Sequence, residues 1–118
     1  MPLRYAILHH QLADGESHFD LLFETAPGSS LATWRSPAWP IEHPTEVIRI
    51  KDHRRIFLDF EGEISGGRGY VTRVAGGECE VDIGEAQRWT IRLINGAPAQ
   101  TLQLEPIASE RWLLRQRV

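Results

Sequence analysis

The chain has 118 residues, of which 42% are hydrophobic and 25% charged, and its formal net charge at pH 7 is −3. These values fit a single globular domain (1–118) and exclude a disordered tail, a coiled coil or a fibrous repeat. The slightly acidic balance argues against nonspecific coating of nucleic acid, although it leaves a local basic site open. No apolar run reaches the ~18 residues that cross a bilayer, and the N-terminal residues lack a secretory signal, so we expect no membrane contact. The single cysteine, Cys79, cannot form an internal disulfide, which favours a cytoplasmic location.

Short runs that are rich in β-branched and aromatic residues predict strands along the whole chain. Turn sequences separate these runs, among which Asn95-Gly96 is the clearest hairpin signal and Gly76-Gly77 is another predicted turn. A short helical turn is predicted within 52–60, and 36–44, which contains three prolines, is predicted to be an ordered surface loop. The predicted strands are 4–10, 18–24, 31–35, 46–50, 69–74, 78–83, 88–94, 101–105 and 111–115.

Eight or nine strands at roughly ten-residue spacing predict an all-β fold with little helix. An open sheet of that size leaves unpaired edges, so a small closed or nearly closed β-barrel of about eight strands is favoured. The part of the chain beyond residue 84 is expected to supply hairpin strands that close the barrel. Trp34, Trp89 and Trp112 lie in strand-like runs and are predicted core residues.

His18 and Asp20, separated by one residue, form the most specific local feature. Residues two apart on a strand point to the same face, so these two side chains are expected to project together. His10 ends the preceding strand, and the short connection 11–17 permits an antiparallel return that places His10 opposite His18, whereas His9 points to the other face. Two imidazoles and a carboxylate form a donor set for a divalent metal. An exposed, hydrogen-bonded His–Asp pair is the alternative interpretation.

Two further segments are candidates for contact with an anion. His53 lies in the charged segment 51–55, where a histidine flanked by arginines can hold an anion or transfer a proton. The glycine-rich segment 61–69 contains Arg68, and the backbone amides of such a loop can form an anion-binding nest. A solvated turn and a tight strand connection are the respective structural alternatives.

Taken in order, these segments resemble the phosphoesterase domain of bacterial DNA ligase D, a domain that also occurs as short stand-alone proteins. The resemblance implies a small β-barrel that binds manganese or a similar divalent ion. It implies removal of a 3′-phosphate, or of a terminal 3′-ribonucleotide, from a nucleic-acid end during DNA repair, which leaves a 3′-hydroxyl. The similarity covers roughly residues 4–83 and rests on the ordered blocks 7–10, 18–24, 31–34, 52–53 and 59–66.

The resemblance also implies roles for individual residues. By position, His10, His18 and Asp20 match the metal ligands of the family, and His53 matches its phosphate-contacting histidine. On this reading all four are catalytic residues. Two imidazoles and one carboxylate leave positions on the metal open for a phosphate oxygen or an activated water.

The chain departs from the family pattern where the family has three further phosphate donors. An arginine two residues beyond the metal-binding aspartate is replaced by Leu22, and a tyrosine four residues beyond the phosphate histidine is replaced by Phe57. A lysine after the tryptophan-containing strand is also missing, with Ala38 near that place. Candidate replacement cations for phosphate binding are Arg35, Arg55 and Arg68.

The sequence is therefore compatible with three functions. The favoured one is a metal-dependent phosphoesterase that acts on nucleic-acid 3′ ends or on small phosphoesters. The second is a module of the same fold that binds metal, phosphate or nucleic-acid ends and has lost catalysis together with the missing donors. The third is a non-haem iron oxygenase, because two histidines and one aspartate on strands also form a facial triad. The sequence leaves open whether the substrate is DNA, RNA or a small phosphate, and whether a DNA ligase or polymerase is a partner.

Overall fold

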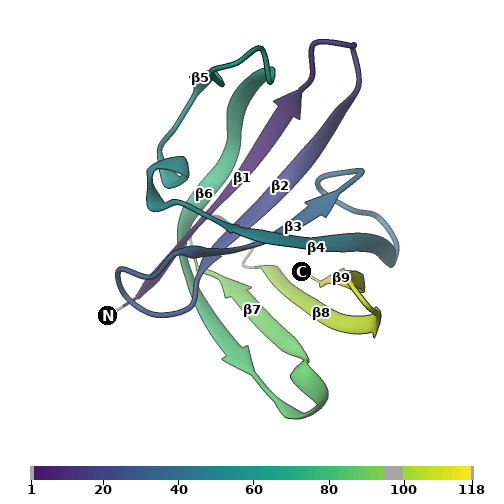
Figure 1. Ribbon diagram of the computed structural model, residues 1–118. Coiled ribbons are helices and arrows are strands. Elements are labelled where there is room, and N and C mark those ends of the chain that lie inside the picture. Colours follow the sequence, from purple (N-terminus) through teal and green to yellow (C-terminus); the bar gives the residue numbers. More distant parts are fainter. Residues whose placement is uncertain (1, 95–99, 118) are drawn as a thin grey trace.

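The structure is a computed structural model that describes residues 2–94 and 100–117, and these residues form mainly strands (Figure 1). No helix in this part of the chain is long and apolar enough to cross a membrane. In chain order the elements are β1 (Leu3–Gln11), β2 (Ser17–Glu24), β3 (Leu31–Ser36), β4 (Thr45–His53), the 3₁₀ turn η1 (Arg55–Leu58), β5 (Gly62–Glu63), β6 (Tyr70–Ile83), the 3₁₀ turn η2 (Glu85–Gln87), β7 (Trp89–Leu93), β8 (Gln100–Ala108) and β9 (Arg111–Arg117).

Eight of the strands form a closed ring in the order β1-β2-β3-β4-β9-β8-β7-β6, and β6 pairs back onto β1. All of these pairings are antiparallel, and the short strand β5 adds to β6 outside the ring. Closure matters because it gives the backbone groups of the ring strands partners on both sides. The predicted closed barrel of about eight strands is confirmed, and the strands beyond residue 84 do complete it.

The segment 69–83 differs from its prediction. Gly76-Gly77, predicted to be a turn between two strands, lies inside the single long strand β6. The strand continues because Gly76 pairs with Ala6 and Gly77 with Tyr5 of β1. A Cβ atom at Gly76 would lie 2.0 Å from the Arg73 guanidinium, so this glycine makes room for a side chain and does not reverse the chain.

Other local predictions have mixed outcomes. The predicted helical turn within 52–60 is present as η1, and 37–44 is a loop. The turn η2 and the two-residue strand β5, inside the glycine-rich segment, were not expected. The Asn95-Gly96 hairpin signal lies outside the described residues.

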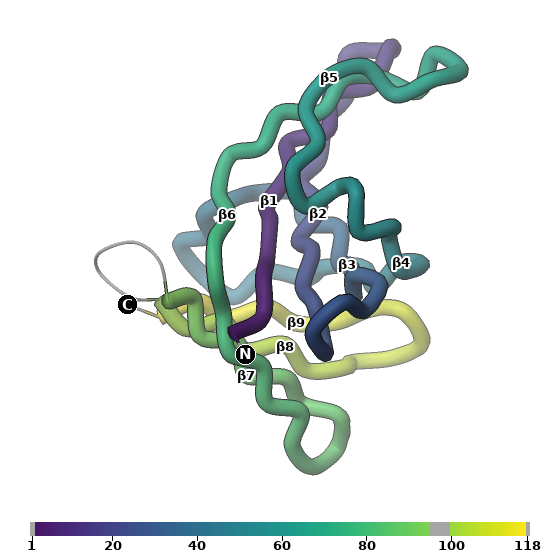
Figure 2. The backbone as a smooth tube through the Cα atoms, turned by 90° about the vertical axis from the view of Figure 1, so that its left-hand side faces the viewer, coloured from purple at the N-terminus to yellow at the C-terminus, as the bar shows by residue number. Residues whose placement is uncertain are grey.

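Strands β1, β2 and β3 are buried on both faces, which is the feature of the fold that creates the site. One face contributes to an interior cluster that includes residues from all eight ring strands, among them the predicted core residues Trp34, Trp89 and Trp112. The opposite face contributes to a second, smaller cluster in which Leu8, Leu22, Leu31, Leu58 and Val71 are buried. The covering side chains of this cluster come from the chain between β4 and β6, which lies on one side of β1 and β2 in Figure 2.

Candidate metal centre and its cleft

His10, His18 and Asp20 meet on the outer face of β1 and β2. His10 pairs directly with His18 across the two antiparallel strands, as the sequence predicted, and alternation places Asp20 on the same face as His18. One ligand atom from each residue lies within 4.8 Å of the other two. His9 points to the opposite face, where its ring stacks on Phe19 at a centroid distance of 4.6 Å.

The spacing of the three donor groups fits a single cation. The distance is 3.2 Å between His10 Nδ1 and His18 Nε2, 3.4 Å between His18 Nε2 and Asp20 Oδ1, and 4.0 Å between His10 Nδ1 and Asp20 Oδ2. Around an ion with bonds of ~2.1 Å, neighbouring ligand atoms lie about 3.0–3.4 Å apart. Small side-chain rotations therefore bring the two imidazole nitrogens and one Asp20 oxygen into one coordination sphere.

Asp20 provides the strongest indication that these three side chains bind an ion or a ligand. Its side chain is 5% exposed, and its Oδ1 atom is buried without a hydrogen-bond partner among the described residues. A buried carboxylate oxygen without a partner is costly unless a ligand or ion completes it. The same atom lies 3.7 Å from Arg35 Nε on the neighbouring strand, where Asp20 pairs with Arg35.

The glycine-rich segment fixes the orientation of His10. Its Nε2–H donates a hydrogen bond of 2.7 Å to the backbone carbonyl of Arg68, which leaves the Nδ1 lone pair directed toward His18 and Asp20. Gly69 makes this approach possible: its φ is +105°, and a Cβ there would lie 2.2 Å from the Gln11 carbonyl oxygen and 3.1 Å from His10 Nε2. This role of the segment was not foreseen from the sequence.

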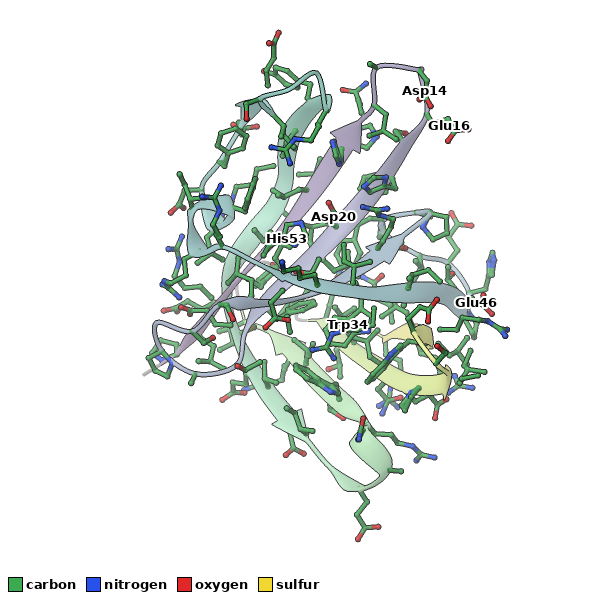
Figure 3. The ribbon with its side chains drawn as sticks, viewed as in Figure 1. Asp14, Glu16, Asp20, Trp34, Glu46 and His53 are labelled. Atoms are coloured by element: carbon green, nitrogen blue, oxygen red, sulfur yellow. The ribbon has the colours of Figure 1, made fainter. Side chains whose placement is uncertain are left out.

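A cleft of about 390 Å³ opens beside the candidate metal group. Its lining includes His10 and Asp20 from β1 and β2, and residues from the end of β4 and the start of η1. Figure 3 shows Asp20 and His53 near each other. His53, the predicted phosphate contact, lines this cleft. Its Nδ1–H donates to the Lys51 carbonyl at 3.1 Å, and its ring packs edge-on against Phe57 at 5.5 Å. His53 Nε2 therefore stays available to a bound group.

The predicted replacement cations separate into two groups. Arg35 and Arg68 line the cleft, although Arg68 Nε donates to the Ser65 carbonyl. Arg55 is not among the lining residues, because its guanidinium is bound to the buried Glu24 carboxylate and to the Ser29 carbonyl. We therefore leave Arg55 out of the phosphate site.

Two cations of the cleft were missed as site residues. Lys51 and Arg54 both line it, although the sequence interpretation of segment 51–55 named neither of them among the phosphate-binding residues. The signal that could have found them is the run of charges on either side of His53. Recognising its meaning also requires knowing that η1 turns the chain back over β1 and β2.

The structure places two of the positions at which the sequence departs from the pattern of the ligase D phosphoesterase domain. Leu22 is fully buried in the outer-face cluster, where it packs with other aliphatic side chains and offers no donor. Phe57 lines the cleft beside His53 but has no hydroxyl group.

No protein-family model and no curated protein matches the sequence of this chain. The molecule is thus defined by its own structure as a closed antiparallel barrel with a candidate metal group on the outer face of β1 and β2.

Proposed function

We propose that this protein is a metal-dependent phosphoesterase that removes a 3′-phosphate, or a terminal 3′-ribonucleotide, from nucleic-acid ends. The observation that carries the proposal is the buried Asp20 Oδ1, which accepts no hydrogen bond from the described residues, beside two imidazoles and at the edge of a cleft lined by cationic side chains. A resident cation explains the first feature, and an anionic substrate explains the second. The resemblance to the phosphoesterase domain of DNA ligase D supplies the class of substrate.

The metal would be held by His10 Nδ1, His18 Nε2 and one oxygen of Asp20. A nitrogen-rich donor set with one carboxylate suits a divalent transition metal, and we propose Mn²⁺ on the strength of the family resemblance. When bound, such an ion polarises a phosphoryl oxygen and lowers the pKa of a coordinated water. The Arg68 carbonyl holds the His10 ring in the tautomer that coordination requires.

The remaining residues of the cleft bind and orient the phosphate. Arg35 projects from β3 next to Asp20 and presents a cation to the equatorial phosphate oxygens. His53 presents Nε2, and because Nδ1–H already donates to a carbonyl, a hydrogen bond from Nε2 to phosphate needs the protonated ring. Charge that develops on the phosphoryl group during displacement is then surrounded by fixed positive groups.

Release of inorganic phosphate from a primer that ends in a 3′-phosphate tests this function. We expect release with Mn²⁺, none with excess EDTA, and a loss of at least about 10³-fold in His18→Ala, because a metal ligand is removed. His43→Ala is the matched control, since His43 is an exposed histidine outside the cleft, and it should retain full activity. An unchanged rate in His18→Ala would contradict the proposal.

A module that binds metal and nucleic-acid ends without turnover is the second candidate. The observation that favours it is the absence of two donors, because Leu22 is buried among aliphatic groups and Phe57 lacks a hydroxyl. The same assay separates the two functions: binding of Mn²⁺ and of the primer without phosphate release would identify the binding module. Phe57→Tyr should then be the substitution that restores a donor beside His53.

A further inference from the structure

The cleft carries more positive charge than a single terminal phosphate requires. Two carboxylates line it, namely Asp20 and Asp52. Four permanently cationic side chains face them: Arg35, Lys51, Arg54 and Arg68. A phosphomonoester carries about −1.5 to −2 at pH 7. A divalent ion on the proposed centre, together with Arg35, offsets that charge, so the other cations remain for a further anion.

Cations elsewhere on the surface are mostly neutralised within the protein. Arg111 lies 2.8 Å from Glu46, Arg4 lies 2.7 Å from Asp59, and Arg88 lies 3.3 Å from Glu105. In contrast, no carboxylate in the described part of the chain forms an ion pair with Lys51 or Arg54. Unpaired charge is thus concentrated on one wall of the cleft.

Asp52, although it lines the cleft, is directed toward other groups. Its Oδ1 lies 3.9 Å from Arg49 Nη2, and its Oδ2 accepts a hydrogen bond of 3.1 Å from Ser30 Oγ. Asp52 therefore offsets Arg49 and does not neutralise Lys51 or Arg54, which flank it in sequence.

Lys51 and Arg54 precede and follow His53 in the chain, at the end of β4, and all three residues line the cleft. The Arg54 guanidinium lies 6.0 Å from the centre of the Phe57 ring, and His53 packs edge-on against the same ring. Phe57 thus keeps Arg54 beside the proposed phosphate contact. Both cations are exposed, as expected for groups that bind a solvated phosphodiester backbone.

We infer that Lys51 and Arg54 form a second phosphate subsite, which binds the phosphodiester next to the terminal phosphate of a nucleic-acid strand. The inference rests on the proposed function for the position of the terminal phosphate, and it adds that the substrate is a strand of two or more nucleotides. A mononucleotide fills only the metal side of the cleft. Lys51 and Arg54 accordingly discriminate by substrate length and not by base.

The test compares two ligands of different length. One is thymidine 3′-monophosphate, and the other is a 5′-fluorescent tetrathymidylate with a 3′-phosphate, both bound to the Mn²⁺-loaded protein. Affinity for the tetranucleotide is measured by fluorescence anisotropy, and affinity for the mononucleotide by competition, across a series of salt concentrations. The variant is Lys51→Gln/Arg54→Gln. Its matched control is Arg92→Gln/Arg117→Gln, which removes two exposed cations outside the cleft and so tests the effect of net charge alone.

We expect the cleft variant to lose about tenfold or more in affinity for the tetranucleotide and less than twofold for the mononucleotide. The slope of log K against log salt should fall in magnitude by about 0.7, since each neutralised phosphate of a single strand contributes ~0.7. The control variant should change both affinities equally and slightly. An equal loss for both ligands would place Lys51 and Arg54 on the terminal phosphate and overturn the inference, and so would an unchanged tetranucleotide affinity.

Failure of this inference is distinct from failure of the proposed function. Binding is measured without reference to turnover, so a protein that releases no phosphate still tests the subsite through its length dependence. Conversely, phosphate release at equal catalytic efficiency from the mononucleotide and the tetranucleotide would preserve the phosphoesterase and remove the second subsite.

Discussion

The two faces of β1, β2 and β3 differ in how their polar groups are used. Trp34 and Arg35 are neighbours on β3, yet Trp34 is fully buried in the barrel interior, whereas Arg35 is about half-exposed beside Asp20. In the interior, Trp34 packs edge-on against Trp89 and Trp112, and the Arg49 guanidinium lies 4.5 Å from its ring centre. Each face holds one buried side-chain atom without a hydrogen-bond partner among the described residues, Trp34 Nε1 in the interior and Asp20 Oδ1 on the outer face, but only the Asp20 oxygen is a metal-ligand atom. The interior face thus uses its large side chains for packing, whereas the outer face places ionisable side chains beside a cleft.

Trp34→Ala should produce the largest change, and it should act on stability. Replacing a buried tryptophan leaves a cavity and costs about 3–5 kcal/mol in the free energy of unfolding. Urea denaturation followed by circular dichroism measures this loss. Trp39→Ala is the control, because Trp39 only packs against the edge of the interior cluster and should cost clearly less. Equal losses in the two variants would contradict the central place given to Trp34.

Glu24→Gln should cost about 2 kcal/mol at pH 7, the range for hydrogen bonds to a charged group. Burial by itself raises the pKa of Glu24. Hydrogen bonds from Arg55 and from the backbone amides of Arg4 and Gly28 together lower the pKa by more than burial raises it, so that it lies below 4.5. The carboxylate therefore stabilises the fold above pH 4.5, and this contribution is lost as the pH falls through the folded-state pKa. Urea denaturation of both proteins should show the difference at pH 7 and its disappearance in acid. A pH-independent difference would refute this account.

Gly69→Ala sharpens the comparison because it alters the outer face alone. A methyl group there collides with the Gln11 carbonyl and with His10, so the Arg68 carbonyl loses its hold on the His10 ring. Loss of such an outer contact typically weakens metal binding about tenfold or more. Calorimetric titration with MnCl₂ measures the affinity. Gly67→Ala is the control, since Gly67 also has a positive φ but has open space around its Cβ position. If both variants bind Mn²⁺ equally well, the orienting role of Gly69 is wrong.

Arg35→Ala should produce the smallest of these effects. Ion pairs of partly exposed side chains contribute ~1 kcal/mol or less, so we expect about a fivefold loss in phosphate affinity. Metal affinity should change much less, because Arg35 is not a ligand. Competition by inorganic phosphate against a fluorescent oligonucleotide measures the first quantity, and calorimetry the second. Unchanged phosphate affinity would exclude Arg35 as a replacement cation.

Much of the fold was predictable because alternation and turn chemistry are local signals. The approximate positions of most strands, the pairing of His10 with His18, and the opposed faces of Asp20 and Leu21 all follow from a period of two and a short hairpin connection. The break predicted at Gly76 was wrong, because the space needed by Arg73 is a tertiary feature that sequence alone does not reveal.

The candidate site was predictable only in part, for the same reason. Its ligand group lies on two adjacent strands, so strand parity was enough to bring it together. The cleft also depends on the chain between β4 and β6, whose return over the sheet follows no periodic pattern. Arg55 was therefore expected at the phosphate site but binds Glu24, and Lys51 and Arg54, which line the cleft, were not named as phosphate-binding residues.

A titration of the purified protein with Mn²⁺ most directly tests whether the outer face binds a cation. The electron paramagnetic resonance signal of the free ion measures how much Mn²⁺ is bound. We predict saturation at one ion per chain in the wild type, and loss of binding in Asp20→Asn, which keeps the shape of the side chain but removes its charge. Asp14→Asn, a substitution at the exposed tip of the hairpin between β1 and β2, should bind as the wild type does. Absence of binding by the wild type, or full binding by Asp20→Asn, would contradict the account.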